Sequence, residues 1–333
     1  MRSVLRVLGA VRRRAAVGLA GAFAAGVLVG GCGVGAPSGL DQPSGFDQLR
    51  AAAFVDGTVI PLSQVHDQLM AVLAKEGQQA RAQLAADHQL DDLARRLVTV
   101  QIRHQLLDIA ARRSGLIVDQ AQVNRVIIEA GGAEVASKGT IFDVDSYRER
   151  VQDKQLMAAL GRAALRNSAV TVDYTTATTR TAAKQRVEEL AQAGSKRARQ
   201  LIDADVRAGK DAELGKRIVA ADDPIFATTP AFGVAEGTVV AFQLDDTKPW
   251  VIMVVKNRAN RGAEASEYAP QLDQIQPVVL EAIGLRQLAR VGDEVGVRLS
   301  PRYGVWDPVN LQVVSDENET GGFVAPLRAA PRA

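Results

Sequence analysis

Apolar residues recur at spacings of three and four along residues 62–167, a pattern that predicts a run of amphipathic helices. Ahead of this run, a short apolar strand breaks at Asp56-Gly57, a dipeptide typical of tight turns. The chain then continues into the first helix, for which Ser63 is the expected N-cap. The folded body is therefore expected to begin near Ala53.

Three further helices are expected in this region. The first is expected over residues 89–113. The second should begin after Asp119, which is its expected cap, and the third covers residues 143–167. His104 falls on the apolar stripe of the first of these, over residues 89–113, where a lone histidine is most simply a core or interface residue.

A different pattern begins at residue 168. β-branched residues alternate over 170–174, a polar helix follows, and two apolar runs at 238–244 and 250–256 flank a turn. This order predicts a small α/β module. Pro277 is expected to start or kink a later helix, and residues 295–299 alternate as a strand. Residues 316–333 show no periodicity and are expected to be disordered.

Composition narrows the function classes. With 47% hydrophobic and 23% charged residues, the 333-residue chain has the balance of a folded protein. Aromatic residues make up only 4% and the formal charge is +2, so a nucleic-acid partner is set aside. Phosphate-binding loops, HExxH, GxSxG and CxxC motifs do not occur in the sequence, and no cofactor or metal is predicted.

The first 32 residues have the order of a secretory signal. Five arginines up to Arg14 precede an uncharged run over residues 15–31. Val29-Gly30-Gly31-Cys32 then resembles the bacterial lipobox, which implies that Cys32 receives a lipid. Cys32 is the only cysteine of the chain. We expect residues 1–31 to be a lipoprotein signal peptide and residues 32–53 a flexible tether; the alternative is an uncleaved anchor helix.

Short motifs in the rest of the chain resemble a family. VDGTVIPLSQVHDQL, SGLIVDQAQVNRVI and, near the C-terminus, SPRYGVWDP resemble SurA-like periplasmic chaperones and PrsA-like foldase lipoproteins of the actinobacterial type. The resemblance implies a helical chaperone domain made of residues 54–167 plus 263–315, completed by the C-terminal helix and strand. Residues 168–262, with the phrase FGVAEGTVVAFQ, resemble an inserted parvulin, the prolyl isomerase domain of these foldases.

The parvulin resemblance does not extend to the active-site residues of that family. Parvulin sites resemble one another in two histidines that face each other across the sheet. This chain has only His66, His88 and His104, all ahead of the inserted region, and residues such as Asp173 or Tyr174 stand on its first strand instead. We therefore predict a degenerate parvulin-like domain without a catalytic residue. Weak isomerase activity stays open.

Together these patterns predict an α+β, predominantly helical protein on the outer face of a bacterial cytoplasmic membrane, held there by a lipid anchor. The expected function is that of a chaperone or foldase that binds unfolded or nascent exported polypeptides. Two alternatives remain at this stage: an active peptidyl-prolyl cis-trans isomerase, and a non-catalytic scaffold lipoprotein that binds one cell-envelope partner.

Overall fold

The structure is a computed structural model that describes residues 50–75, 78–87, 89–259, 272 and 274–329. The predicted signal segment, Cys32 and the tether up to residue 49 lie outside the described residues, as does His88. The described part has a mixed α+β fold in which helices predominate, so the predicted fold class is confirmed. Its helices include none that is both long and apolar enough to cross a membrane.

The described chain opens with a β-hairpin. β1 (Ala51–Val55) pairs antiparallel with β2 (Thr58–Pro61), and Val55 lies opposite Thr58. The two connecting residues, Asp56 and Gly57, have φ angles of 51° and 72°. Positive φ at both positions matches the twist of the flanking strands, so the predicted turn is confirmed. Helix α2 (Leu62–Lys75) begins one residue ahead of Ser63, which therefore lies in its first turn and is not its cap.

The helical run follows the predicted order. Its members are α3 (Gln78–Ala86), α4 (Gln89–Ser114), α5 (Gln120–Glu129), the single-turn α6 (Ala133–Ala136) and α7 (Val144–Asn167). The Asp119 side chain accepts hydrogen bonds from two backbone N–H groups of α5, as predicted. Asp143 and Ser146 form a reciprocal capping box at the start of α7. These caps explain why both helices start where the sequence pattern places them.

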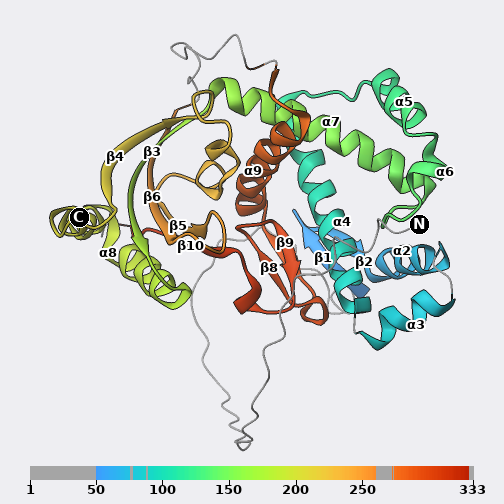
Figure 1. The fold of residues 1–333 in the computed structure, drawn as a ribbon, viewed down its shortest axis with the longest axis horizontal. Helices are drawn as coiled ribbons and strands as arrows, with labels where there is room; N and C mark the ends of the chain where they lie inside the picture. The colour runs from blue at the N-terminus through green and yellow to red at the C-terminus, as the bar shows by residue number, and fades with distance from the viewer. Residues whose placement is uncertain (1–49, 76–77, 88, 260–271, 273, 330–333) are drawn as a thin grey trace, which may run out of the picture. The chain divides into compact units, whose positions relative to one another are not determined.

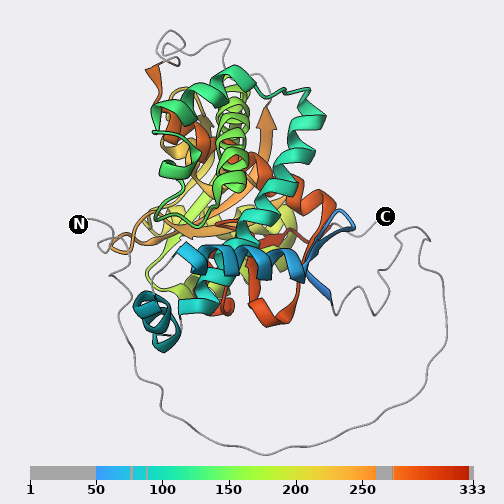
Figure 2. The ribbon, with the colours of Figure 1, turned by 90° about the vertical axis from the view of Figure 1, so that its right-hand side faces the viewer.

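The C-terminal part of the chain returns to this helical region. Helix α9 (Pro277–Val295), which has Pro277 at its first position, packs along α7 and also contacts α4. Strand β7 (Val297–Leu299) then pairs antiparallel with β1, giving a three-stranded sheet in the order β2-β1-β7. Both views place the β1–β2 hairpin beside α4 (Figures 1 and 2). A short hairpin of β8 (Val305–Asp307) and β9 (Gln312–Val314) adds Leu311 and Val313 to the same core.

The inserted region and a strand near the C-terminus form an antiparallel sheet. Its five strands, in the spatial order β10-β5-β6-β3-β4, are β10 (Gly322–Pro326), β5 (Thr238–Gln243), β6 (Trp250–Ala259), β3 (Ala169–Ala177) and β4 (Glu213–Val219). Helix α8 (Arg180–Arg207), kinked at Gly194, covers one face of this sheet (Figure 1). Residues of α7, α9 and the 3-10 turns η1 (Phe226–Thr228) and η2 (Pro230–Phe232) pack on the other face.

The expected disorder of residues 316–333 is wrong for its described part. Gly322–Pro326 forms β10, an edge strand whose residues pair in register with β5 from Gly322↔Phe242 to Pro326↔Thr238. Phe323 also stacks on Trp250, with ring centroids 5.7 Å apart. The five-stranded sheet therefore takes a strand from outside residues 168–262. A five-residue strand of this kind forms only when a neighbouring strand pairs with its backbone N–H and C=O groups. Because its own sequence shows no periodicity, the sequence alone did not predict it.

Candidate functional site

Asp173 and Tyr174, at the strand where the parvulin resemblance implies a histidine, both serve as structural contacts. Asp173 is buried; its carboxylate accepts a 2.6 Å hydrogen bond from the Gly215 backbone N–H and lies 3.5 Å from the Lys256 ammonium. The Tyr174 hydroxyl donates to Asp211, 3.0 Å away, and burial is the main reason that its pKa is raised. The two side chains therefore hold β4 and its neighbours in place.

The two histidines that the structure describes lie apart from this sheet. His66 is exposed on α2, and His104 lies on α4 against α7. The His104 Nδ1 is 2.9 Å from a carboxylate oxygen of Asp153, and its Nε2 is 3.3 Å from Glu149 and 3.7 Å from Asp108. The hydrogen bond with Asp153 is the main cause that raises the pKa of His104 to about 9, against the opposing effect of burial. His104 is therefore a charged link between two helices, which fits the predicted interface role.

No group of three or more His, Cys, Asp or Glu side chains in the described ranges is arranged to hold a metal ion. The contacts of His104 with Asp108, Glu149 and Asp153 form an ion-pair network, in which Asp153 is 49 residues from His104 along the chain. Because Asp153 is so far from His104 in the sequence, the helical periodicity around His104 could not indicate that this histidine carries a positive charge.

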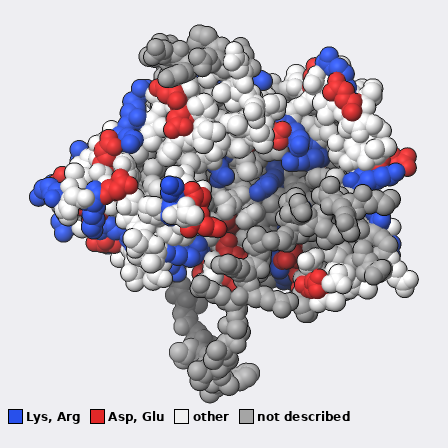
Figure 3. Space-filling view, viewed as in Figure 1, with Lys and Arg blue, Asp and Glu red and all other residues white. Residues whose placement is uncertain are grey.

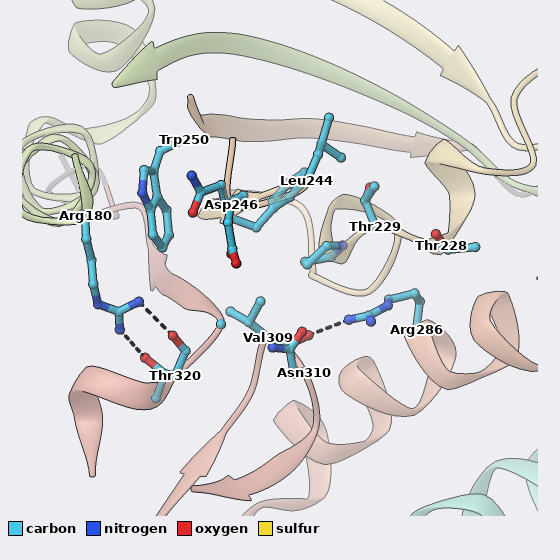
Figure 4. A pocket seen from close by; sticks show the side chains of 14 residues that line it. Arg180, Thr228, Thr229, Leu244, Asp246, Trp250, Arg286, Val309, Asn310 and Thr320 are labelled. Atoms are coloured by element: carbon cyan, nitrogen blue, oxygen red, sulfur yellow. Dashed lines mark hydrogen bonds between the residues drawn. The ribbon is translucent and has the colours of Figure 1, made fainter. Parts of the chain in front are cut away.

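A cavity of about 440 Å³ opens where the five-stranded sheet meets α9 and the β8–β9 connection (Figure 4). Its lining mixes apolar and polar side chains: Arg180, Thr228, Thr229, Pro230, Phe242, Gln243, Leu244, Asp246, Trp250, Arg286, Val309, Asn310, Thr320 and Gly321. Six stretches far apart in the sequence supply these residues. No pattern within one segment could have indicated the cavity.

Arg180 forms one wall of the cavity. Its guanidinium lies over the rings of Trp250 and Phe323, at 5.5 and 4.7 Å from their centroids. The same group donates to the Thr320 carbonyl at 2.7 Å and to the Glu317 carbonyl at 2.9 Å. Arg180 is thereby fully engaged in fixing the segment that leads into β10, as Figure 4 shows for its bonds to Thr320.

Two half-buried arginines hold the opposite wall. Arg103 of α4 donates to the carbonyls of Leu311 and Asn310, at 2.7 and 3.0 Å, and Arg286 of α9 donates to the carbonyl of Val309. Burial lowers the pKa of Arg103 to about 10 and also lowers that of Arg286. The three consecutive carbonyls thus depend on cations from two different helices.

A second candidate surface lies on the helical part. Ile128 on α5, Val135 on α6 and Val144 at the start of α7 are 74%, 55% and 47% exposed. The three helices contact one another. Where α5 lies in Figure 1, the space-filling view shows uncharged surface between groups of charged side chains (Figure 3). Because contiguous exposed apolar surface marks interaction sites, we take these three side chains on contacting helices as a second candidate surface.

Comparisons with known proteins add little. No family model matches the chain, and no curated protein matches it. Among solved structures it is similar to the foldase protein PrsA from Streptococcus pneumoniae str. Canada MDR_19A, at 13% sequence identity over 72% of this chain and 90% of that chain. The TM-score of this similarity is 0.20, which is too low to assign a function.

Proposed function

We propose that this protein is an extracytoplasmic, lipid-anchored chaperone that binds unfolded or newly exported polypeptides. The signal-like segment and the lipobox-like Cys32 support the location. The motifs that resemble SurA-like and PrsA-like proteins support the activity. Both rest on the sequence.

The observation that carries the proposal is the exposed apolar surface of Ile128, Val135 and Val144. An unfolded client exposes apolar side chains along an extended backbone. Burying these side chains against an apolar surface removes them from water, which lowers the free energy of the complex. Binding of this kind needs no catalytic group.

The isomerase alternative has less support. Lowering the barrier of about 18–20 kcal/mol for peptide-bond rotation needs groups that stabilise the twisted amide. Asp173 and Tyr174 already have partners within the sheet, and both faces of the sheet are packed against helices or turns.

The test is suppression of aggregation of an unfolded client by the full chain purified in detergent. Replacing Ile128, Val135 and Val144 together by Ser should remove most of the suppression while the melting temperature stays near that of the wild type, because exposed side chains add little to stability. The matched control replaces Ile225 and Val278, which are equally exposed elsewhere, by Ser. Equal loss in test and control variants would contradict the assigned surface. No suppression by the wild-type chain would favour the scaffold alternative.

A further inference from the structure

The two sides of the five-stranded sheet differ in construction. At one edge, β4 carries the exposed charged residues Glu213, Lys216 and Arg217, and its pairing with β3 has a register shift. Charges and irregular pairing are devices by which an edge strand discourages pairing with another chain. Toward the other edge, β5 has the uncharged sequence TVVAFQ, is buried from Thr238 to Phe242 and pairs with β6 without a shift. β5 is therefore built as an interior strand that needs a neighbour on each side.

β10 supplies that neighbour from outside residues 168–262, as the different colours of the two strands in Figure 1 show. Most of β10 stays accessible: Phe323, Val324 and Ala325 are half-buried and Pro326 is exposed. A segment with few buried contacts opens at a lower free energy than the core of a fold. β10 can therefore leave the sheet at a lower cost than β5 or β6.

The side chains of β10 show which kind of chain fits beside β5. Phe323, Ala325 and Leu327 pack against the cluster under α8, while Val324 packs against the cluster on the opposite face. The ring of Phe323 lies against Trp250, with centroids 5.7 Å apart. Because side chains alternate between the two faces of a strand, an extended segment with an aromatic residue and further apolar residues at alternate positions fills the same places.

The backbone of β10 shows which groups make the contact. Leu327 donates its backbone N–H to the Gly237 carbonyl at 2.7 Å. Hydrogen-bonded pairs alternate with non-hydrogen-bonded pairs along an antiparallel ladder, so Ala325 also turns its N–H toward β5, whereas Val324 and Val240 form a non-hydrogen-bonded pair. When a strand is added to a sheet edge, these main-chain bonds provide affinity and the alternate side chains provide specificity.

We propose that β10 is a displaceable cover on β5, and that an extended client segment with an aromatic residue and alternating apolar residues takes its place. β10 then competes with the client within the chain, and the apparent affinity for the client scales with the fraction of molecules in which β10 is released. The inference rests on the proposed chaperone function for the class of client. The contact lies on the sheet and does not use the surface of Ile128, Val135 and Val144.

The test uses the full chain in a Cys32→Ser background and a fluorescent peptide with the sequence of residues 320–329, TGGFVAPLRA. In Gly322→Ala, a Cβ would lie 1.9 Å from the Ala241 carbonyl oxygen of β5, so β10 no longer fits against β5. This variant should bind the peptide saturably and at least about tenfold more tightly than the parent chain, because the competing strand is released. A folded Gly322→Ala chain without saturable binding would overturn the proposal.

Two altered peptides separate strand addition from general apolar binding. N-methylation at the position of Ala325 removes an N–H that faces β5, and Phe323→Ser removes the ring that meets Trp250. Each altered peptide should bind at least about tenfold more weakly than the parent peptide. Equal binding of all three peptides would contradict strand addition.

A reversible cross-link keeps the proposal testable if Gly322→Ala does not fold. With Val240→Cys and Val324→Cys, two cysteines lie opposite each other, and Cys32→Ser leaves them as the only thiols. Oxidation then holds β10 on β5 and should abolish peptide binding, while reduction should restore it. The same binding in both forms would mean that the peptide binds elsewhere and that β10 is not a cover.

Hydrogen exchange in the parent chain tests the release of β10 without any substitution in the sheet. The Ala325 amide should exchange at least about tenfold faster than the amide of Val254 on β6, and equal protection of the two would overturn the proposal. The variant with Ile128, Val135 and Val144 replaced by Ser should bind the peptide like the parent chain, whether or not the wild-type chain suppresses aggregation. Failure of this inference and failure of the proposed function are thereby distinguishable.

Discussion

Gly161 of α7 and Gly284 of α9 face each other where the two helices cross. A Cβ placed on Gly161 would lie 1.9 Å from the Leu280 carbonyl oxygen and 3.0 Å from the Gly284 nitrogen. A Cβ on Gly284 would lie 1.9 Å from the Met157 carbonyl oxygen. The two backbones therefore touch directly, and this contact brings the C-terminal helix onto the N-terminal helical run.

Gly161→Ala should destabilise the protein by about 3 kcal/mol or more, because the added methyl group meets rigid backbone and forces the helices apart. Thermal and urea unfolding measure the effect. The matched control is Gly292→Ala in α9, where a Cβ would meet only the side chains of Leu106, at 3.5 Å, and Val297, at 3.7 Å, both ordinary contacts. That variant should be neutral or stabilising by up to about 1 kcal/mol, because alanine favours helix. Similar losses in both variants would mean that the crossing is not this tight.

Stability should fall in mildly alkaline solution because of His104. Its pKa is raised from 6.5 to about 9 in the folded chain, chiefly by the hydrogen bond with Asp153. The stabilisation is complete below about pH 6.5 and is lost as the pH rises through about 9, amounting to at most about 3 kcal/mol. Unfolding of wild type and His104→Gln from pH 6 to 10 measures it: the gap between them should be widest at pH 6 and close toward pH 10. A constant gap would argue against the charged form.

The segment 316–329 should contribute measurably to stability, since β10 closes one edge of the sheet. Truncation after Ser315 should lower the melting temperature by several degrees, and Phe323→Ala alone should cost about 2 kcal/mol through the lost contact with Trp250. Removal of residues 330–333 only is the control and should have little effect. A truncated chain that melts like the wild type would instead support the original expectation of a disordered tail.

Cys32→Ala should prevent incorporation of labelled fatty acid and leave the chain without its mature membrane-bound form, since Cys32 is the only thiol that could carry a lipid. Labelling in bacterial cells followed by membrane fractionation measures both. Cys32→Ser is a second variant with the same expectation, because in the lipobox that this segment resembles the lipid is attached to a thiol and not to a hydroxyl. Labelling of either variant at the wild-type level would rule out this anchor.

The purified chain should leave the cis-trans exchange of an X-Pro peptide at its uncatalysed rate, with a time of tens to hundreds of seconds. The residues on β3 that stand where the resemblance implies a histidine, Asp173 and Tyr174, are occupied by contacts within the sheet. Exchange measured by NMR with increasing protein, beside a known prolyl isomerase, provides the test. A large and saturable acceleration would support the isomerase alternative.

Local chemistry could be predicted from the sequence. The turn at Asp56-Gly57, the cap at Asp119 and the start of α9 at Pro277 depend on residues a few positions away, so each appears in the sequence as a short pattern. The α+β class followed from the same patterns. The resemblance to chaperone lipoproteins likewise rests on short motifs, and the predictions for Cys32 and for client binding rest on it still.

Only the tertiary structure decided which distant residues meet. β10 becomes a strand because β5 accepts its backbone hydrogen bonds, and His104 is charged because Asp153 approaches it from another helix. Arg286 and Thr229 line one cavity because α9 and the turns η1 and η2 pack beside the same sheet. Burial and electrostatic pairing are properties of a local environment in space, and residues far apart in the sequence build that environment.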